Sequence, residues 1–395
     1  MQFLSVIGFF VIFAFSTNAN SESRKNSLVK ELENTHTRNL LNNIYYEYPT
    51  QEPRRKAKYL RKKLKEIKEK VNLSYLNSEN KKEIAILEFL ENKESNLQKD
   101  VSFPNRVKYL SSLSYPLDEC SQMLTTEKAE IEEKLNDRRI RFSGSKIPAQ
   151  TKSPKPFFFE STDEGRQKYL DLLANDLKKT GSLALSILEN YPKSALTVVG
   201  ERENDFSFYY RDRILRININ NLATLPRDET IALAAFFGLP GAGAIREDGK
   251  ISLSKFLYLP SYNLGWATYS LNELAELDPE NSGAYLNFRK LIIVLGLTDL
   301  NMHIYRWSTY EGSKFLEENL NYSGNRTQLF LDQIRENSGF YLSVSLGGVF
   351  FKDVKRKCLE KRSSDFCGKE LNQLIVDSGT TPLPYLKEFL ISQFF

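Results

Sequence analysis

Residues 236–242 read Phe-Phe-Gly-Leu-Pro-Gly-Ala, a turn inside an apolar and otherwise helical half of the chain. Gly and Pro interrupt helices, so this turn separates two helical stretches. Shortly before it, residues 195–199, 206–211 and 214–219 are rich in β-branched or aromatic side chains and are separated by polar turns. Such short runs predict strands. The sequence therefore predicts a mainly α protein with a small antiparallel sheet, at about residues 195–219, before its central helices.

The rest of the chain divides by composition. Residues 20–39 are polar and are predicted to be a flexible leader, whereas residues 40–142 are predicted to form an N-terminal helical region. Residues 143–156 contain too much Gly and Pro for a helix and predict a loop, which is the best internal boundary. Residues 157–395 then form the predicted C-terminal helical domain.

The N-terminus carries an export signal. Phe3 to Phe15 is an almost continuous apolar run, too short to span a bilayer, and small residues at Thr17 and Ala19 suit a cleavage site. We therefore expect a signal peptide over residues 1–19 and a periplasmic or secreted protein. No Lys or Arg precedes the run, so an uncleaved N-terminal anchor is the alternative. No later segment is predicted to cross a membrane.

Charge does not point to nucleic acid. The formal net charge is +5 over 395 residues, and neither a zinc-finger spacing nor an aromatic RNA-binding signature is present. Residues 54–70 concentrate Lys and Arg, which is compatible with a patch for anionic lipid or a polyanion, or with a solvated helix face. Partial balance by Glu66 and Glu69 favours the solvated face.

Three cysteines allow one bridge. Cys358 and Cys367 enclose a short polar stretch, and export would permit a disulfide between them. Three unlinked thiols are the alternative, and in either case Cys120 stays free. A structural zinc site usually needs four ligands at paired spacings, so zinc binding by cysteine is not expected.

An ordered series of short landmarks follows the predicted sheet, and no single one is specific. They are residues 216–220 (Arg-Ile-Asn-Ile-Asn), 238–241 (Gly-Leu-Pro-Gly), 265–269 (Gly-Trp-Ala-Thr-Tyr), 299–303 (Asp-Leu-Asn-Met-His), 306–308 (Arg-Trp-Ser), 342–347 (Leu-Ser-Val-Ser-Leu-Gly) and 382–386 (Pro-Leu-Pro-Tyr-Leu). In this order they resemble the bacterial domain-of-unknown-function 885 family, whose members are similar to helical zinc peptidases. The resemblance covers about residues 157–395 and, more weakly, residues 40–110. It implies a multi-helix zinc-peptidase-like scaffold.

The resemblance does not extend to the metal ligands and the catalytic carboxylate of the family. The family motif His-Glu-x-x-Pro-Gly-His would supply metal-binding imidazoles and a carboxylate that acts on the metal-bound water. Phe236 and Ala242 stand at the two histidine positions, and Phe237 stands at the glutamate position. Leu271 stands at the glutamate of the family's Gly-Trp-Ala-x-Tyr-x-Glu helix. The chain has only two histidines, His36 and His303. We therefore expect no metal, no other cofactor and an apolar plug at the old metal position.

Few other residues are candidates for chemistry or binding. Asp299 and His303 lie four residues apart on one predicted helix face, as a weak acid–base pair or as a structural hydrogen bond. Trp266, Tyr269 and Trp307 would line a ligand pocket or belong to the core.

These observations lead to one functional hypothesis with two alternatives. The hypothesis is an exported pseudoenzyme, a catalytically inactive relative of a zinc-peptidase-like family that keeps a cleft for a peptide or an envelope protein. The first alternative is a metal-independent hydrolase that uses Asp299 and His303. The second is a structural envelope protein. Neither a substrate nor an oligomeric state is predicted.

Overall fold

The computed structural model describes residues 26–45, 47, 53–97, 99–143, 157–191, 196–201, 208–211, 214–245, 252–320, 322 and 324–394. The chain divides into two compact units. The first comprises Met1–Gln98 with Lys250–Phe256, and the second comprises Lys99–Gly249 with Leu257–Phe395. The predicted signal peptide, residues 1–19, lies outside the described residues. So does all of the predicted loop at 143–156 except Ser143, which ends a helix.

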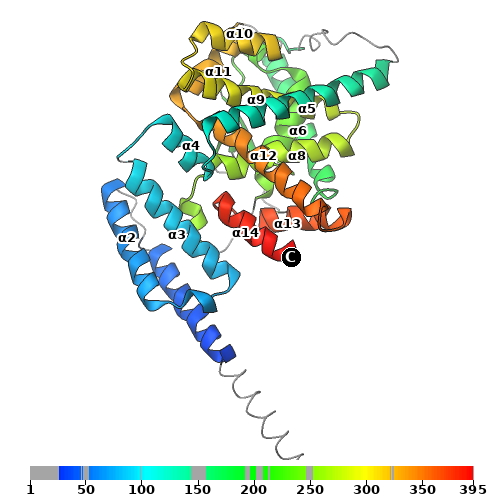
Figure 1. Ribbon diagram of the computed structural model, residues 1–395. Coiled ribbons are helices and arrows are strands. Elements are labelled where there is room, and N and C mark those ends of the chain that lie inside the picture. Colours follow the sequence, from blue (N-terminus) through cyan, green and yellow to red (C-terminus); the bar gives the residue numbers. More distant parts are fainter. Residues whose placement is uncertain are drawn as a thin grey trace, which may run out of the picture. The chain divides into compact units, whose positions relative to one another are not determined.

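The first unit is helical (Figure 1). It contains a helix over residues 26–45, followed by α2 (Pro53–Lys70), η1 (Leu73–Tyr75), α3 (Ser78–Leu97) and η5 (Leu253–Phe256). Leu60 and Ile67 of α2 are almost completely buried, as are Leu87 and Leu90 of α3. Their spacing of seven residues in α2 and three in α3 puts each pair on one face of its helix, as expected within the helical region predicted over residues 40–142.

A distant segment completes this unit. The buried carboxylate of Glu83 in α3 accepts hydrogen bonds from the backbone N–H of Leu253 (2.7 Å) and the hydroxyl of Ser252 (2.6 Å). Nearby, the rings of Tyr45 and Phe256 lie 5.3 Å apart. Residues 252–256 therefore belong with the N-terminal helices, although about 150 residues of the other unit precede them.

Two boundaries differ from the sequence-based expectation. Residues 26–45 form a helix, whereas a flexible leader was expected as far as residue 39. The polar side chains that suggested a leader have structural partners: Asn34 donates to the carbonyl of Tyr75 (3.0 Å) and accepts from the N–H of Asn77 (2.8 Å). The units also divide at residues 98–99 rather than within 143–156.

The second unit holds most of the helices, as Figure 1 shows. They are α4 (Phe103–Ser111), α5 (Leu117–Ser143), α6 (Asp163–Ala184), α7 (Thr230–Phe237), α8 (Pro260–Leu277), α9 (Ser282–His303), α10 (Thr309–Leu320), α11 (Asn325–Glu336), α12 (Phe340–Leu359), α13 (Leu371–Ser378) and α14 (Leu383–Phe394). Helices α8 and α12 approach each other closely where glycines face each other. A Cβ added at Gly265 would lie only 2.6 Å from the Cα of Gly347, so a larger residue would not fit there. The mainly helical prediction is confirmed.

The small sheet is mixed, not wholly antiparallel. Strands β1 (Thr197–Glu201), β2 (Phe208–Arg211) and β3 (Ile214–Asn218) lie in the order β1-β3-β2. The pair β2–β3 is antiparallel, but β1 runs parallel to β3. Sequence pattern located the strands but not their pairing. The central strand is the one whose Leu215 and Ile217 are fully buried, and it takes a partner on both edges.

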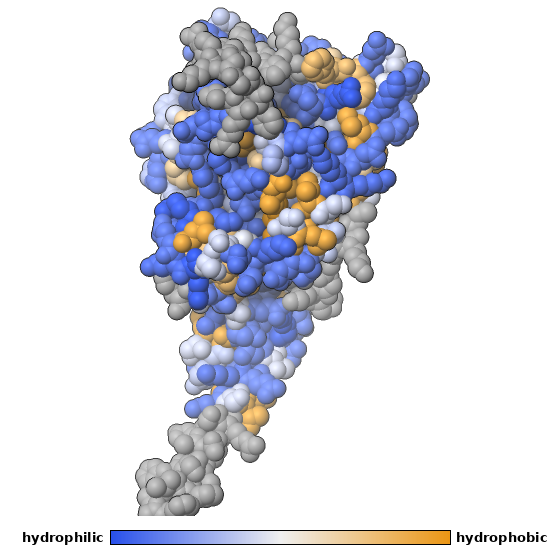
Figure 2. Space-filling view, turned by 90° about the vertical axis from the view of Figure 1, so that its right-hand side faces the viewer, coloured by the Kyte–Doolittle hydropathy of each residue, from blue (hydrophilic) through white to orange (hydrophobic). Residues whose placement is uncertain are grey.

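None of the helices in the described part of the chain is long and apolar enough to cross a membrane. On the face turned to the viewer in Figure 2, hydrophobic side chains occur in small separate groups on a mostly hydrophilic surface.

Candidate functional site

Helix α7 and the turn after it contain residues 236–242, which the resemblance matches to a metal-binding motif. All eight residues of α7 are buried. The turn contains a cis peptide bond between Leu239 and Pro240, and the indole N–H of Trp266 donates to the carbonyl of Pro240 (2.8 Å). Only glycine fits at Gly241, because a Cβ there would lie 2.1 Å from the carbonyl oxygen of Phe236. The turn is therefore built into the core and anchored to α8.

The four side chains at the positions that the resemblance matches to ligands and a base are hydrocarbon and buried. Phe236, Phe237, Ala242 and Leu271 are 2%, 3%, 6% and 0% exposed. The Phe236 ring packs edge-on against Phe237 (4.8 Å between centroids) and contacts Phe288 of α9 (5.3 Å). None of the four has a lone pair for a metal or a group that can transfer a proton.

Asp299 and His303 are brought together as their spacing predicted, but the carboxylate is already occupied. Asp299 is completely buried in α9 and accepts hydrogen bonds from the backbone N–H groups of Gly339 (3.0 Å) and Leu342 (3.1 Å). These groups open helix α12, whose first N–H groups have no partner within the helix. Asp299 therefore caps α12.

His303 completes this arrangement. Its Nδ1 lies 3.0 Å from the Asp299 carboxylate and 2.9 Å from the Asp299 carbonyl oxygen, and its ring stacks on Phe103 (4.9 Å). Burial lowers the pKa of His303, but the hydrogen bonds and negative charge of Asp299 outweigh burial, so the pKa is raised overall. A histidine held in this way is suited to positioning the carboxylate rather than to accepting a proton from a substrate.

The three aromatic candidates do not share a pocket. Trp266 and Tyr269 are 0% and 1% exposed, and both pack against Phe351 of α12. Burial raises the pKa of Tyr269 well above its ordinary value, so its phenol stays protonated. Trp307 is partly exposed and contacts Phe315 in α10 (5.2 Å). Trp266 and Tyr269 therefore belong to the core, and among the described residues they line no open cleft.

A buried charge cluster joins four helices and was not predicted from the sequence. Arg289 of α9 is 2% exposed, forms an ion pair with Glu127 of α5 and donates to Asn272 of α8 (3.2 Å). The other oxygen of Glu127 accepts from Lys352 of α12 (2.8 Å). The partners are distant in sequence, so no spacing could have indicated the cluster. Each charge in the cluster is paired with an opposite one, so the cluster links the four helices without leaving an isolated buried charge.

A second buried cluster forms around Glu229, the residue just before α7. The guanidinium of Arg326 pairs with both oxygens of Glu229 and lies over the ring of Tyr322 (3.9 Å), whose hydroxyl donates to the same carboxylate. Neither this cluster nor the preceding one gathers metal ligands. Among the described residues, no group of three or more His, Cys, Asp or Glu side chains is placed to hold a metal ion.

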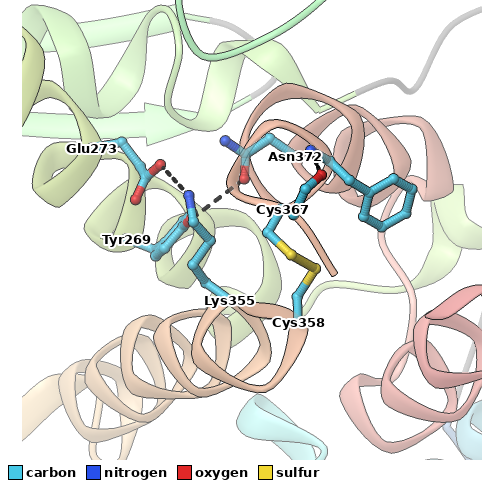
Figure 3. Close-up of a disulfide and its surroundings, with 8 residues drawn as sticks. Tyr269, Glu273, Lys355, Cys358, Cys367 and Asn372 are labelled. Atoms are coloured by element: carbon cyan, nitrogen blue, oxygen red, sulfur yellow. Dashed lines mark hydrogen bonds and ion pairs between the residues drawn. A yellow bond between two sulfur atoms is a disulfide. The ribbon is translucent and has the colours of Figure 1, made fainter. Parts of the chain in front are cut away.

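The disulfide lies at the far end of α12 (Figure 3). Cys358 is bonded to Cys367 of η6 (Phe366–Glu370), with their Cα atoms 5.7 Å apart, and both residues are buried. Figure 3 also shows Lys355 paired with Glu273 of α8 (2.9 Å) and the hydroxyl of Tyr269 donating to Asn372 of α13 (3.4 Å). The bond therefore connects α12 to the segment that leads into α13. Cys120 is a free, buried thiol.

A surface groove lies between α12 and α14. Val354, Leu390 and Ile391 give it an apolar lining, and Lys357 and Lys387 are among its charged lining residues. Its cavity volume is about 180 Å³. Pockets for whole small-molecule ligands are larger, about 300–1,000 Å³. This groove therefore suits one or two side chains of a partner better than an entire substrate.

Comparison with known proteins finds similar folds but no known activity. No family model matches the chain, and no curated protein matches it. The structure is similar to that of a "putative lipoprotein" from Colwellia psychrerythraea, with a TM-score of 0.62 and 15% identity over 87% of this chain and 70% of that one. It is also similar to a "putative lipoprotein of unknown function" from Shewanella oneidensis, with a TM-score of 0.51 and 14% identity over 86% of this chain and 72% of that one. At such identities the likeness shows a shared fold, not a shared activity.

Proposed function

We propose that this chain is an exported, envelope-associated protein without catalytic activity, built on a scaffold related to the helical zinc peptidases that its landmarks resemble. One observation carries the proposal. Phe236, Phe237, Ala242 and Leu271 are all buried hydrocarbon at the positions where that resemblance expects ligands and a base. Losing a single ligand would leave the others buried and unpaired, which costs free energy, whereas replacing the whole set removes this cost. The similar structures described as lipoproteins are compatible with an envelope location.

The hydrolase alternative has less support. A general base needs a free lone pair within reach of a substrate. The carboxylate of Asp299 is fully buried and accepts from two backbone N–H groups of the α12 N-terminus as well as facing His303. The carboxylate of this pair therefore caps the N-terminus of α12.

The test of inactivity is hydrolysis of a mixed peptide library by the purified protein, with and without added zinc. We expect no cleavage above that of buffer under either condition, while a zinc peptidase assayed in parallel cleaves the library. Cell fractionation tests the location, and the account expects the chain in the envelope or the medium. Zinc-dependent cleavage by this chain would refute inactivity, and retention in the cytoplasm would refute export.

We propose that the groove between α12 and α14 receives side chains of a partner, because its lining combines apolar residues with charged ones of both signs, Lys357, Lys387 and Glu360, and its size suits side chains. A photo-crosslinking residue at Ile391, which is 39% exposed, is expected to trap a specific partner in cells. The matched control is Tyr310, which is 75% exposed in α10 and lies outside the groove. Identical crosslinked products from both positions, or none from Ile391, would contradict this assignment.

A further inference from the structure

The positive charge of the protein is concentrated in one helix. Helix α2 contains ten Lys or Arg residues and two Glu residues, which gives 10 − 2 = +8. The whole chain has a net charge of 55 − 50 = +5, so the remainder carries −3. A basic helix on an otherwise slightly acidic chain is a local feature and not a consequence of overall composition. Such a concentration is the electrostatic mark of a surface for anions.

The packing of α2 decides which of its charges face outward. Its apolar side, with Leu60 and Ile67, is buried within the first unit. Along one edge, Arg61 pairs with Glu91 of α3 (3.0 Å) and Lys68 pairs with Glu88 (2.9 Å). These pairs balance charge along one edge of the helix, while burial of Leu60 and Ile67 sets its orientation.

A second row of cations remains at the surface. Arg55, Lys58, Lys62 and Lys65 are exposed and follow one another at intervals of three, four and three residues, so they share one helix face. Within the part of the chain that the structure describes, no carboxylate lies within ion-pair distance of Lys58 or Lys62. The pair of Lys65 with Glu69 is long (3.6 Å) and more than half exposed on both sides. We call Arg55, Lys58, Lys62 and Lys65 the basic stripe.

The same unit also exposes apolar side chains. Leu28, Val29 and Leu32, on the helix over residues 26–45, are 58%, 46% and 69% exposed. Their spacing of one and four residues places them on one side of that helix. A soluble polyanion offers no apolar surface to such side chains. The acyl boundary beneath lipid headgroups does, and a basic patch combined with an apolar insertion is the usual way for a protein to bind a membrane surface.

We propose that the first unit binds the surface of an anionic phospholipid bilayer. The basic stripe binds the headgroup phosphates, and Leu28, Val29 and Leu32 enter the headgroup layer. Each cation near such a surface adds to the attraction, and salt weakens it, because the surface potential falls off within a Debye length. The membrane as partner rests on the proposed export, but its test is made on purified protein and depends neither on export nor on catalytic silence.

The test is co-sedimentation of the full exported chain with two kinds of vesicle, one of phosphatidylcholine alone and one of equal parts phosphatidylcholine and phosphatidylglycerol. We expect binding to the anionic vesicles, weakened by salt, and little binding to the neutral ones. The triple variant Lys58→Gln, Lys62→Gln, Lys65→Gln should bind the anionic vesicles at least about tenfold less tightly. The matched control, Lys168→Gln, Lys178→Gln, Lys314→Gln, removes the same charge from the second unit and should bind as the wild type does.

Two further measurements separate a membrane from a polyanion. The double variant Leu28→Ser, Leu32→Ser should lose vesicle binding but keep any weak binding to inorganic polyphosphate. Circular dichroism melting verifies that every variant is folded. Equal binding of the stripe variant and its control to anionic vesicles would overturn the proposal. So would wild-type binding to polyphosphate that is as tight as binding to vesicles and insensitive to the serine substitutions.

Discussion

Phe236 is a buried aromatic residue of the core. Its ring packs against Phe237 and Phe288, and it stands where the resembling family places a metal-binding imidazole. A phenyl ring gains free energy from burial at this position. The resemblance implied an apolar residue in place of a ligand at this position, and the structure adds its aromatic neighbours.

Truncation of this ring should be costly. We expect Phe236→Ala to lower the free energy of unfolding by about 3–5 kcal/mol, because it opens a cavity in a close-packed core. Denaturant unfolding measures the change. The control is Phe157→Ala, which removes a phenylalanine side chain that is 72% exposed and should change stability by no more than about 0.5 kcal/mol. Equal effects of the two substitutions would show that Phe236 is not a core residue.

His303 should give stability a specific dependence on pH. Its pKa is raised in the folded protein, mainly by Asp299 acting against burial. The folded state therefore holds the proton more tightly than the unfolded chain does. The stabilising contribution is complete below the unfolded-state pKa of histidine, about 6.5, and is lost as pH rises through the folded-state pKa.

The measurement is the difference in unfolding free energy between wild type and His303→Gln across this pH range. We expect the difference to shrink as pH rises. His36→Gln, which removes the only other histidine of the chain, is the control and should leave the pH dependence due to His303 in place. A difference that grows with pH would mean that the imidazole is stabilised in its neutral form.

At the level of elements, periodicity located helices and strands but not their partners. Composition and periodicity predicted a helical region over residues 40–142, and isolated β-branched or aromatic runs predicted the strands. The parallel pairing of β1 with β3 was not predictable, because alternation says which face is buried and not which strand lies next. Contacts such as Asp299 with Gly339 and Glu229 with Arg326 join residues 40 and 97 positions apart. No local pattern indicates such pairs.

The disulfide that joins α12 to η6 should stabilise the second unit. Replacing both Cys358 and Cys367 by Ser is expected to cost about 2–3 kcal/mol, because the bond closes a short loop and restricts the unfolded chain. Cys120→Ala is the matched control for losing a buried cysteine. Burial raises the pKa of Cys120 to about 11, so its thiol should resist alkylation until the protein unfolds.

Mass measurement after alkylation reports the thiols directly. The native, unreduced protein should gain no label, and the unfolded, unreduced protein should gain label at Cys120 alone. Labelling of Cys358 and Cys367 without a reductant would show that the bridge is absent from the exported protein.

For the whole molecule, the mainly helical architecture agrees with the prediction from the sequence. A lost metal site belongs to the proposed function and rests on the resemblance of the landmarks. The structure adds that the positions concerned are buried, that Asp299 caps a helix, and that two paired charge clusters lie between the helices of the second unit. The two surfaces that we propose for binding are the groove between α12 and α14 and the basic stripe of α2.

The zinc content of the purified protein, prepared without chelators and measured per chain, tests the central claim most directly. A catalytic zinc site typically uses three protein ligands, and the resemblance would draw them from positions now held by Phe236, Ala242 and Leu271. The account predicts zinc far below one equivalent per chain and no change in the unfolding midpoint when a chelator is added. One tightly held zinc per chain, with peptide hydrolysis that is lost on chelation and restored by zinc, would contradict it.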